Sequence, residues 1–390
     1  MATATAPSLP TRRDPRGFWA LTALGALVAL AGLAAAHYME ESGHIVTGMN
    51  NQIVWGLPHV FAIFLIVAAS GALNVASIGS VFGQAAYKAR APLSGLLCLA
   101  LLAGGLAVLM LDLGRPERMV VAATHYNFKS VFAWNVFLYT GMFAVVAVYL
   151  WMQMEKRMNR FAKPAGIAAL VWRFVLTTGT GAIFAFLVAR QAYASAVLPP
   201  LFIVMSLAWG MAVFVLVQAA FGGAVSDELL RRMRGLLGVL VALVLYFTAV
   251  YHLTNVYFAR AAAFERFILL DGGVYPLLFW AGYVLAGSIA PMVLVWRPGA
   301  GAGSLRAAAA LTLLGAFALL YVFIIGGQAF PLEIFPGYEV ASSYRDGAIA
   351  SYAPSLPEVL LGIGGVAAAF VITLVGTQLL DIAPADSARG

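Results

Sequence analysis

Apolar blocks long enough to cross a lipid bilayer recur along these 390 residues, and they constrain the fold more than any other feature. A helical span needs about 20 mostly apolar residues. The chain is 63% hydrophobic and only 10% charged, with a mean hydropathy of +0.92. We therefore predict an all-α, polytopic membrane protein with ten transmembrane helices. The expected spans are 18–36, 53–79, 93–112, 131–153, 166–189, 198–222, 235–258, 274–296, 306–327 and 357–380.

Basic residues are divided unevenly between the two sets of loops. Of the 23 Lys and Arg residues, fifteen lie on the side of the termini, seven lie in the alternate loops, and Arg173 lies within a span. The positive-inside rule then predicts that both termini are cytoplasmic. All five histidines and ten of the sixteen carboxylates fall on or near the outer face. The net charge of +7 thus reflects topology and gives nucleic-acid binding no support.

The expected organisation is a single membrane domain, residues 1–390, with two four-helix bundles and flanking helices. Residues 53–190 would form the first bundle, and residues 198–327 the second. Two outer loops, 113–130 and 328–356, are longer than the rest, and long ordered loops usually serve a partner or a site. We therefore expect both loops to bind a soluble partner on the outer face.

Two smaller features limit the alternatives. The N-terminal Thr11-Arg12-Arg13 resembles a twin-arginine-type signal, but a retained first helix with a basic flank is the favoured interpretation. The single cysteine, Cys98, lies inside the third expected span. It excludes an intramolecular disulfide and any cysteine-ligated iron–sulfur cluster or zinc site within this chain.

Polar residues gather at the outer ends of spans two and three. Trp55 and His59 lie four residues apart on one helix face, with Pro58 in the first turn between them. Asp112 and Arg115 end the third span. Ionisable residues at this depth are costly unless they are paired or functional, so a simple Asp112–Arg115 ion pair remains an alternative.

The segment that leads into the fourth span adds His125, Asn127, Ser130 and Trp134, although aromatic residues at this level are also ordinary interface residues. A quinone head group needs a hydrogen-bond donor, an acid or base, and an apolar groove. We therefore predict a quinone site at these outer ends. His59 would donate to a quinone carbonyl and Asp112 would exchange the proton. Arg115 would orient Asp112, and His125 would close the site or relay protons. Trp55, Asn127, Ser130 and Trp134 would line it.

Other polar residues leave rival functions open. Tyr251-His252-x-x-Asn255 lies at the outer end of the seventh span, and Asn74, Arg173 and Gln218 lie within or near the apolar zone. The latter three could form a proton path or simply bond helices together, and helix packing is favoured. A b-haem cytochrome would need paired histidines at matched depth. A transporter without a redox role would need polar residues near the midplane.

Three motifs resemble the NrfD/PsrC family of integral membrane subunits: Trp55-Gly-Leu-Pro-His59, Leu111-Asp-Leu-Gly-Arg-Pro116 and Asn127-Phe-Lys-Ser130. The ten-span layout is similar to the longer, HybB-like branch. Further segments look like the DsrP branch, from the DsrMKJOP complex of dissimilatory sulfur metabolism. These segments are Tyr38-Met-Glu, Gly48-Met-Asn-Asn-Gln52, Arg157-Met-Asn-Arg160, Tyr246-Phe-Thr-Ala-Val-Tyr-His252 and Phe267-Ile-Leu-Leu-Asp-Gly-Gly273.

The resemblance implies a function and a set of partners. It implies a subunit of the bacterial inner membrane that exchanges electrons between a quinone, menaquinone or ubiquinone, and a periplasmic ferredoxin-like iron–sulfur subunit of the DsrO type. DsrM-, DsrK- and DsrJ-like subunits would complete the complex, and no tightly bound metal or haem is expected. His59, Asp112, Arg115 and His125 match the polar positions of the family's quinone site. Pro58 departs from the short-branch pattern and leaves the quinone's hydrogen-bond partner open.

Overall fold

A computed structural model describes residues 15–221, 225–332, 347–380 and 382, and every regular element among them is a helix. The predicted ten-helix fold is confirmed, because ten of these helices are long and apolar enough to span a membrane. Those spans are α1 (Pro15–Ser42), α2 with α3 (Leu57–Ala72, Asn74–Ser80), α5 (Ala91–Leu111), α7 (Val131–Met154), α8 (Ala162–Ala185), α9 (Leu198–Ala220), α10 (Asp227–Tyr257), α12 to α13 (Val274–Leu277, Leu278–Ile289, Ala290–Trp296), α14 to α15 (Ala302–Tyr321, Val322–Gly326, Gly327–Ala329) and α16 (Leu356–Leu379).

Two span boundaries differ from the sequence prediction in ways that affect the outer end. The first helix continues to Ser42, so His37 is helical and faces Glu41 one turn later at 3.6 Å. The second begins at Leu57 rather than at residue 53, because Gly56 is its N-cap and Pro58 takes a first-turn position. Residues 52–56 are consequently an extended entry segment rather than helix. The Thr11-Arg12-Arg13 segment lies outside the described residues.

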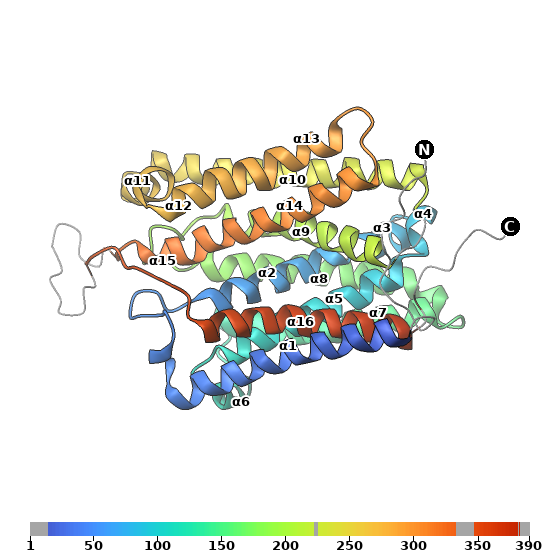
Figure 1. Cartoon of the computed structure of the whole chain (residues 1–390), viewed down its shortest axis with the longest axis horizontal. Helices are drawn as coiled ribbons and strands as arrows, with labels where there is room; N and C mark the ends of the chain where they lie inside the picture. Colours follow the sequence, from blue (N-terminus) through green and yellow to red (C-terminus); the bar gives the residue numbers. More distant parts are fainter. Residues whose placement is uncertain (1–14, 222–224, 333–346, 381, 383–390) are drawn as a thin grey trace.

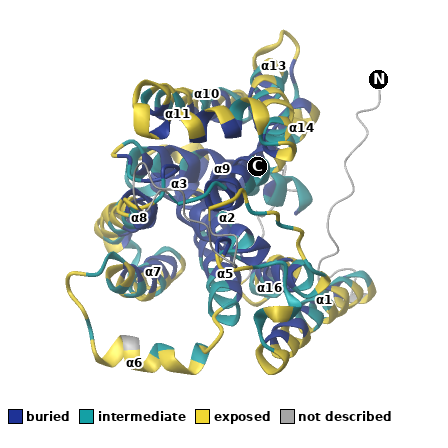
Figure 2. Cartoon of the chain, turned by 90° about the vertical axis from the view of Figure 1, so that its left-hand side faces the viewer, coloured by how far each residue is buried: buried dark blue, intermediate teal, exposed yellow. Residues whose placement is uncertain are grey.

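The helices run side by side, and both α1 and α16 have their chain-terminal ends at the same end of the molecule (Figure 1). We call the opposite end the far end. It carries the entry to α2, the end of α5, α6 (Met119–Thr124) and α11 (Ala259–Arg266) (Figures 1 and 2). The positive-inside prediction makes the far end the outer one.

Most helices pack against helices that are close to them in the chain, and two further contacts, α2 with α9 and α1 with α16, join distant parts of the chain. Helix α2 packs on α5, and α7 packs on α5 and α8, while α9, α10, α13 and α14 contact one another in the other half. Helices α2 and α9 join the halves. Helices α1 and α16 pair with each other, and α16 lies against α5 and α2. As a result α2 is largely surrounded by protein, while α1 has one face open (Figure 2).

The junction of α2 and α9 depends on two glycines. A Cβ atom on Gly71 would lie 1.6 Å from the carbonyl oxygen of Ser206, and one on Gly210 would lie 2.1 Å from the carbonyl carbon of Gly71. Small residues let helix backbones approach closely in lipid, where packing drives association. Asn74 adds a hydrogen bond from its Nδ2 to the Leu207 carbonyl at 2.8 Å. The polar residue predicted to serve packing at this depth therefore does join helices.

Candidate functional site

Trp55 lies in the entry segment and His59 in the first turn of α2, so they do not share a helix face as the spacing predicted, but their side chains still meet. Their rings stack with centroids 4.9 Å apart and planes 6° from parallel. The edge of the buried Phe184 ring packs on Trp55 from α8, at 5.6 Å. The result is a flat aromatic wall with an imidazole at its inner end.

This wall borders a cavity of about 380 Å³ at the far end, which we call the α2–α5 pocket. Its remaining lining comes from the short helix after α1 (His44–Val46), the entry segment and the end of α5. The lining residues are His44, Met49, Val54, Trp55, His59, Leu109, Asp112, Leu113 and Gly114. Two imidazoles, one indole and one carboxyl group thus face an otherwise apolar space.

Asp112 supplies the carboxyl group that lines this pocket. It caps the C-terminus of α5, and its Oδ1 is buried without a hydrogen-bond partner in the described structure. Burial, reinforced by the negative charge of Glu358, raises the pKa of Asp112 to about 8. A carboxyl group with a pKa near neutrality can both accept and donate a proton under physiological conditions. His44 contacts this turn, with its Nε2 3.2 Å from the Asp112 carbonyl oxygen.

Glu358, at the start of α16, is a second carboxylate that the sequence reasoning missed. Its Oε2 accepts hydrogen bonds from the backbone N–H of Gly48 at 2.8 Å and of Ser355 at 2.7 Å. Its Oε1 accepts from the Tyr352 hydroxyl at 2.7 Å. Ser355-x-x-Glu358 is a capping box, a signal readable from the sequence. Glu358 therefore ties the last span to the chain around the pocket.

Tyr352 and Gly56 complete this contact. The Tyr352 hydroxyl accepts a hydrogen bond from the Leu57 N–H at 2.6 Å, so it holds the first residue of α2. Burial and the adjacent Glu358 raise the pKa of Tyr352, which keeps the hydroxyl protonated. A Cβ atom on Gly56 would lie 2.4 Å from Glu358 Oε1, so a larger residue there would have to displace this carboxylate.

Arg190 and Gln328 hold the entry segment from the other side, and neither was among the predicted site residues. Arg190 donates to the carbonyl oxygens of Gln52 at 2.7 Å and Gln328 at 3.0 Å. Gln328 Oε1 accepts from the N–H groups of Val54 and Trp55, both at 3.0 Å, and its Nε2 donates to the Trp55 carbonyl at 3.0 Å. We call Arg190 and Gln328 the entry clamp, because together they fix the backbone that carries the indole.

The other predicted site residues lie away from the pocket lining. Arg115 is exposed, and the described residues contain no Asp112–Arg115 ion pair. His125 is exposed and bonds to Thr124 Oγ1 at 3.1 Å.

Asn127, Ser130 and Trp134 build the turn that starts α7. Asn127 Oδ1 accepts from the Lys129 N–H, Ser130 caps the helix through the Ala133 N–H, and Trp134 donates to the Phe128 carbonyl. The motif Asn127-Phe-Lys-Ser130 therefore has a local structural role in this chain.

Among the described residues, no group of three or more His, Cys, Asp or Glu side chains is placed to hold a metal ion. The buried Arg173 instead donates to the Ser70 carbonyl at 3.1 Å and to Asn74 Oδ1 at 2.9 Å. Arg173 therefore links α8 to α2.

Ten spans and a polar pocket at one end define a polytopic membrane protein with a candidate ligand site. The family model for polysulphide reductase NrfD matches residues 45–332, and this chain belongs to the NrfD family, whose members are membrane subunits of quinone oxidoreductase complexes. It is 30% identical to an Hdr-like menaquinol oxidoreductase integral membrane subunit of Archaeoglobus fulgidus, over 95% of the length of both proteins.

Two further relatives belong to other reductases. A putative membrane subunit of the dimethyl sulfoxide reductase of Halobacterium salinarum is 26% identical over 92% of this chain and 90% of its own length. One of the polypeptides of the polysulfide reductase of Wolinella succinogenes is 27% identical over 72% of this chain and 96% of its own length. All three are subunits of larger assemblies by name, so partner subunits are implied for this chain as well.

Proposed function

We propose that the α2–α5 pocket binds a quinol at the outer face of the membrane, and that Asp112 accepts its protons while its electrons pass to a partner subunit. The observation that carries this proposal is a largely buried carboxyl group with a partnerless oxygen, facing a cavity beside a Trp-stacked imidazole. In a member of the NrfD family, this is the arrangement that a quinol head group needs.

The pocket fits such a head group in size and chemistry. Small-molecule sites range from about 300 to 1,000 Å³ and are mostly apolar with a few polar groups, and the α2–α5 pocket has about 380 Å³. The aromatic wall of Trp55 and His59 offers a face for a planar ring. His59 would hydrogen-bond one quinol oxygen, and Met49 and Val54 would contact the ring or the start of the tail.

Quinol oxidation releases two protons and two electrons. Asp112 takes the protons in turn, since a base with a pKa of about 8 is partly ionised at neutral pH and returns each proton readily to water at the pocket mouth. The name of the Archaeoglobus relative, which matches over almost the whole chain, favours oxidation of menaquinol over reduction of another quinone.

The electrons would leave through an iron–sulfur subunit docked on the far end. The segment from Leu113 to Ser130 lies at the edge of the molecule, and its helix α6 stands apart from the spans (Figure 2). Val120, Val121 and Phe128 on this segment are 67%, 57% and 70% exposed, and clustered exposed apolar side chains typically mark a contact surface. We infer a ferredoxin-like partner of the DsrO type there.

The remaining expectations follow from the same orientation. The far end would face outward from a bacterial cytoplasmic membrane, as the positive-inside rule predicts. The resemblance to the DsrP branch points to an assembly with DsrM-, DsrK- and DsrJ-like subunits and a role in sulfur metabolism. Purification of the native complex tests this part: an iron–sulfur protein should co-purify with the chain, and purification with no such protein would contradict it.

The site is tested by single variants in that purified complex. Oxidation of 2,3-dimethyl-1,4-naphthoquinol with an artificial acceptor should fall steeply in His59→Ala and Asp112→Asn. The matched control is Asp271→Asn, an exposed carboxylate at the far end whose substitution should leave the rate unchanged. Wild-type rates in both His59→Ala and Asp112→Asn would show that quinol reacts elsewhere.

A further inference from the structure

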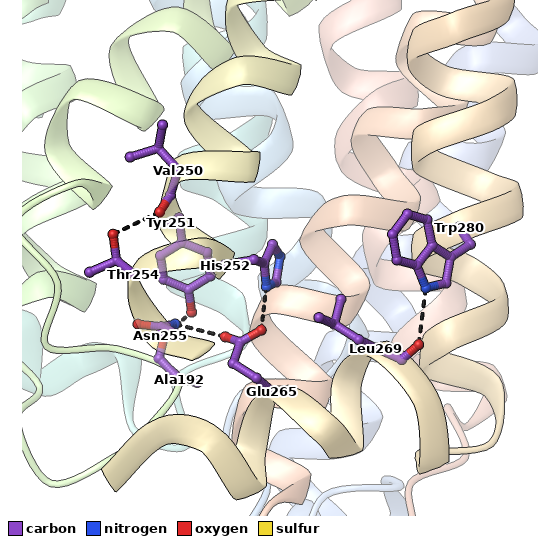
Figure 3. Close-up of polar contacts among 9 residues, drawn as sticks. All are labelled: Ala192, Val250, Tyr251, His252, Thr254, Asn255, Glu265, Leu269 and Trp280. Atoms are coloured by element: carbon purple, nitrogen blue, oxygen red, sulfur yellow. Dashed lines mark hydrogen bonds and ion pairs between the residues drawn. The ribbon is translucent and has the colours of Figure 1, made fainter. Parts of the chain in front are cut away.

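A second buried acid–base pair lies at the far end, in the other half of the molecule. His252 on α10 and Glu265 on α11 meet with Nδ1 2.6 Å from Oε2 (Figure 3). Asn255 donates from its Nδ2 to the other carboxylate oxygen, Oε1, at 2.8 Å. The Glu265 side chain is 1% exposed and the His252 side chain 13%, so the imidazole is the more accessible partner.

The chain folds back on itself to bury this carboxylate. Helix α10 ends at Tyr257, and α11 then turns across its end, with Phe258 as the N-cap residue. Thr248, His252 and Asn255 are spaced four and three residues apart, so their side chains lie on one face of α10. A buried charge at a membrane edge is costly unless it is paired or functional, so the placement of Glu265 opposite this face calls for an explanation.

A small cavity borders His252 and reaches Thr248, one helical turn earlier on α10. It has about 20 Å³, which is room for about one water molecule, and Thr248, Tyr251 and His252 are its polar lining residues. Thr248 Oγ1 lies 2.9 Å from the Tyr283 hydroxyl. Closer to the middle of its span, Thr312 has a buried hydroxyl with no hydrogen-bond partner in the described structure. Buried hydroxyls of this kind usually bind internal water.

The backbone around this cavity is irregular in a way that marks functional sites. The described residues contain three π-helical segments, Phe267–Asp271, Leu278–Ile289 and Val322–Gly326. The first and third supply Ile268 and Phe323 to the cavity wall. The second supplies Phe279, whose ring packs edge-on against the His252 imidazole at 4.7 Å. Such π-helical turns are rare and frequently occur at functional sites, and here all three border one pair.

We propose that His252 and Glu265 form a proton-binding site, separate from the α2–α5 pocket, that exchanges a proton with the outer aqueous phase. In the deprotonated state a neutral imidazole and Asn255 are the side chains that hydrogen-bond the carboxylate. Proton uptake converts His252 to an imidazolium, which compensates the buried charge of Glu265 across the 2.6 Å contact. The proton enters through the partly exposed imidazole, and Thr248 continues the polar contact inward.

We expect His252 and Glu265, rather than the groups around them, to bind the proton. Tyr251 on the same helix is bonded to the Ala192 carbonyl, and Tyr193, Tyr275 and Tyr283 face this region from adjacent segments. The charged side chains nearest to the pair in sequence bind other partners. Arg266 pairs with Asp271 at 2.7 Å on the exposed surface, and Arg260 donates to the Val188 carbonyl. No Lys or Arg forms an ion pair with Glu265 in the described structure.

Infrared difference spectroscopy of the complex through a pH titration tests the proposal directly. In Glu265→Gln the titration of one imidazole should differ from that in the wild type, because this imidazole loses its hydrogen-bonded carboxylate partner. In His252→Gln that imidazole signal should be absent. The control, Asp271→Asn, should match the wild type. Unchanged imidazole titration in Glu265→Gln would overturn the proposal.

A measurement on the unmodified chain covers the case in which these variants do not assemble. With ¹⁵N-labelled histidine, one of the five imidazoles should show a strongly hydrogen-bonded Nδ1 and should change its protonation state during the pH titration. A titration in which no such imidazole is seen would contradict the proposal. Quinol oxidation distinguishes this inference from the proposed function: Glu265→Gln should retain it, whereas Asp112→Asn should not.

Discussion

The two halves of this molecule each hold a carboxyl group at the far end, and they treat it in opposite ways. Asp112 faces a cavity of about 380 Å³, and one of its oxygens has no partner in the described structure. Glu265 is enclosed, and both of its oxygens accept hydrogen bonds from side chains of α10. One carboxyl group is therefore available to a ligand as large as a quinol head group, and the other to a proton.

The difference lies in the surrounding backbone more than in the residues themselves. Around Asp112 the backbone leaves an open space. The space is bordered by regular helix ends and by the entry segment, which the entry clamp holds in place. Around Glu265, a helix that folds back and three π-helical segments close the space to about the volume of one water molecule. Similar polar residues at similar depth thus acquire different chemistry because the backbone controls which molecules can reach them.

The largest expected effect separates the two carboxyl groups. Asp112→Asn should lower quinol oxidation by about 10²-fold or more, since it removes the group that accepts the proton. Glu265→Gln should change the same rate by less than about threefold. Steady-state rates of the purified complex measure both. Equal losses in the two variants would mean that the halves share one proton route.

The entry clamp gives the next largest effect. Arg190→Met should raise KM for quinol about tenfold with a smaller change in kcat, because two charge-assisted hydrogen bonds that hold the aromatic wall are lost. Arg260→Met is the matched control, since Arg260 donates to the Val188 carbonyl, in the same α8–α9 loop that contains Arg190, but is not among the residues of either polar site. A large loss of kcat with unchanged KM would contradict a positioning role for Arg190.

The pH dependence of quinol oxidation should depend on Glu358. Because Asp112 must be ionised to accept a proton, the wild-type rate should rise with pH through about 8. Glu358→Gln removes a negative charge that disfavours ionisation, so the pKa of Asp112 should fall and the profile should move to lower pH, by less than about one unit. The exposed Glu41 provides the control variant Glu41→Gln. A shift to higher pH would show that Glu358 acts in another way.

The smallest effect concerns the aromatic contacts of the two imidazoles. Trp55→Leu should slow quinol oxidation by about two- to tenfold, which corresponds to the roughly 0.5–1.5 kcal/mol of a stacked pair. Phe279→Leu removes the edge-on ring from His252 and should leave quinol oxidation unchanged. Initial rates at saturating and limiting quinol separate the two variants, and a similar loss in both would weaken the assignment of separate sites.

The sequence predicted the spans well because the signal for them is local. Twenty apolar residues and a basic flank are read from one stretch of chain, and all ten spans appear close to their predicted bounds. The sequence also pointed to Trp55, His59 and Asp112, although the expected helix face for Trp55 and His59 is not what joins them, because Trp55 precedes the first residue of α2. Ser355-x-x-Glu358 contained a capping signal that would have drawn attention to Glu358.

The remaining site residues could not be found that way. Gln328 contacts Trp55 across more than 270 positions, and no spacing rule connects them. Arg115 and His125 were grouped with Asp112 because they follow it closely, but the chain leaves α5 and runs outward over the exposed α6 segment. Arg115 and His125 are therefore not among the residues that line the pocket, and their predicted roles stay predictions.

The attachment of Glu358 to the entry segment has a consequence for how the protein is made. The pocket is lined by residues 44–114, which enter the membrane early in synthesis. Gly48 and, through Tyr352, Leu57 are held by the carboxylate that begins the tenth span. A nascent polypeptide halted before residue 358 would carry every lining residue and still lack this attachment. Completion of the chain around the pocket is thus coupled to insertion of the last helix, and under the proposed function an incompletely inserted subunit would not oxidise quinol.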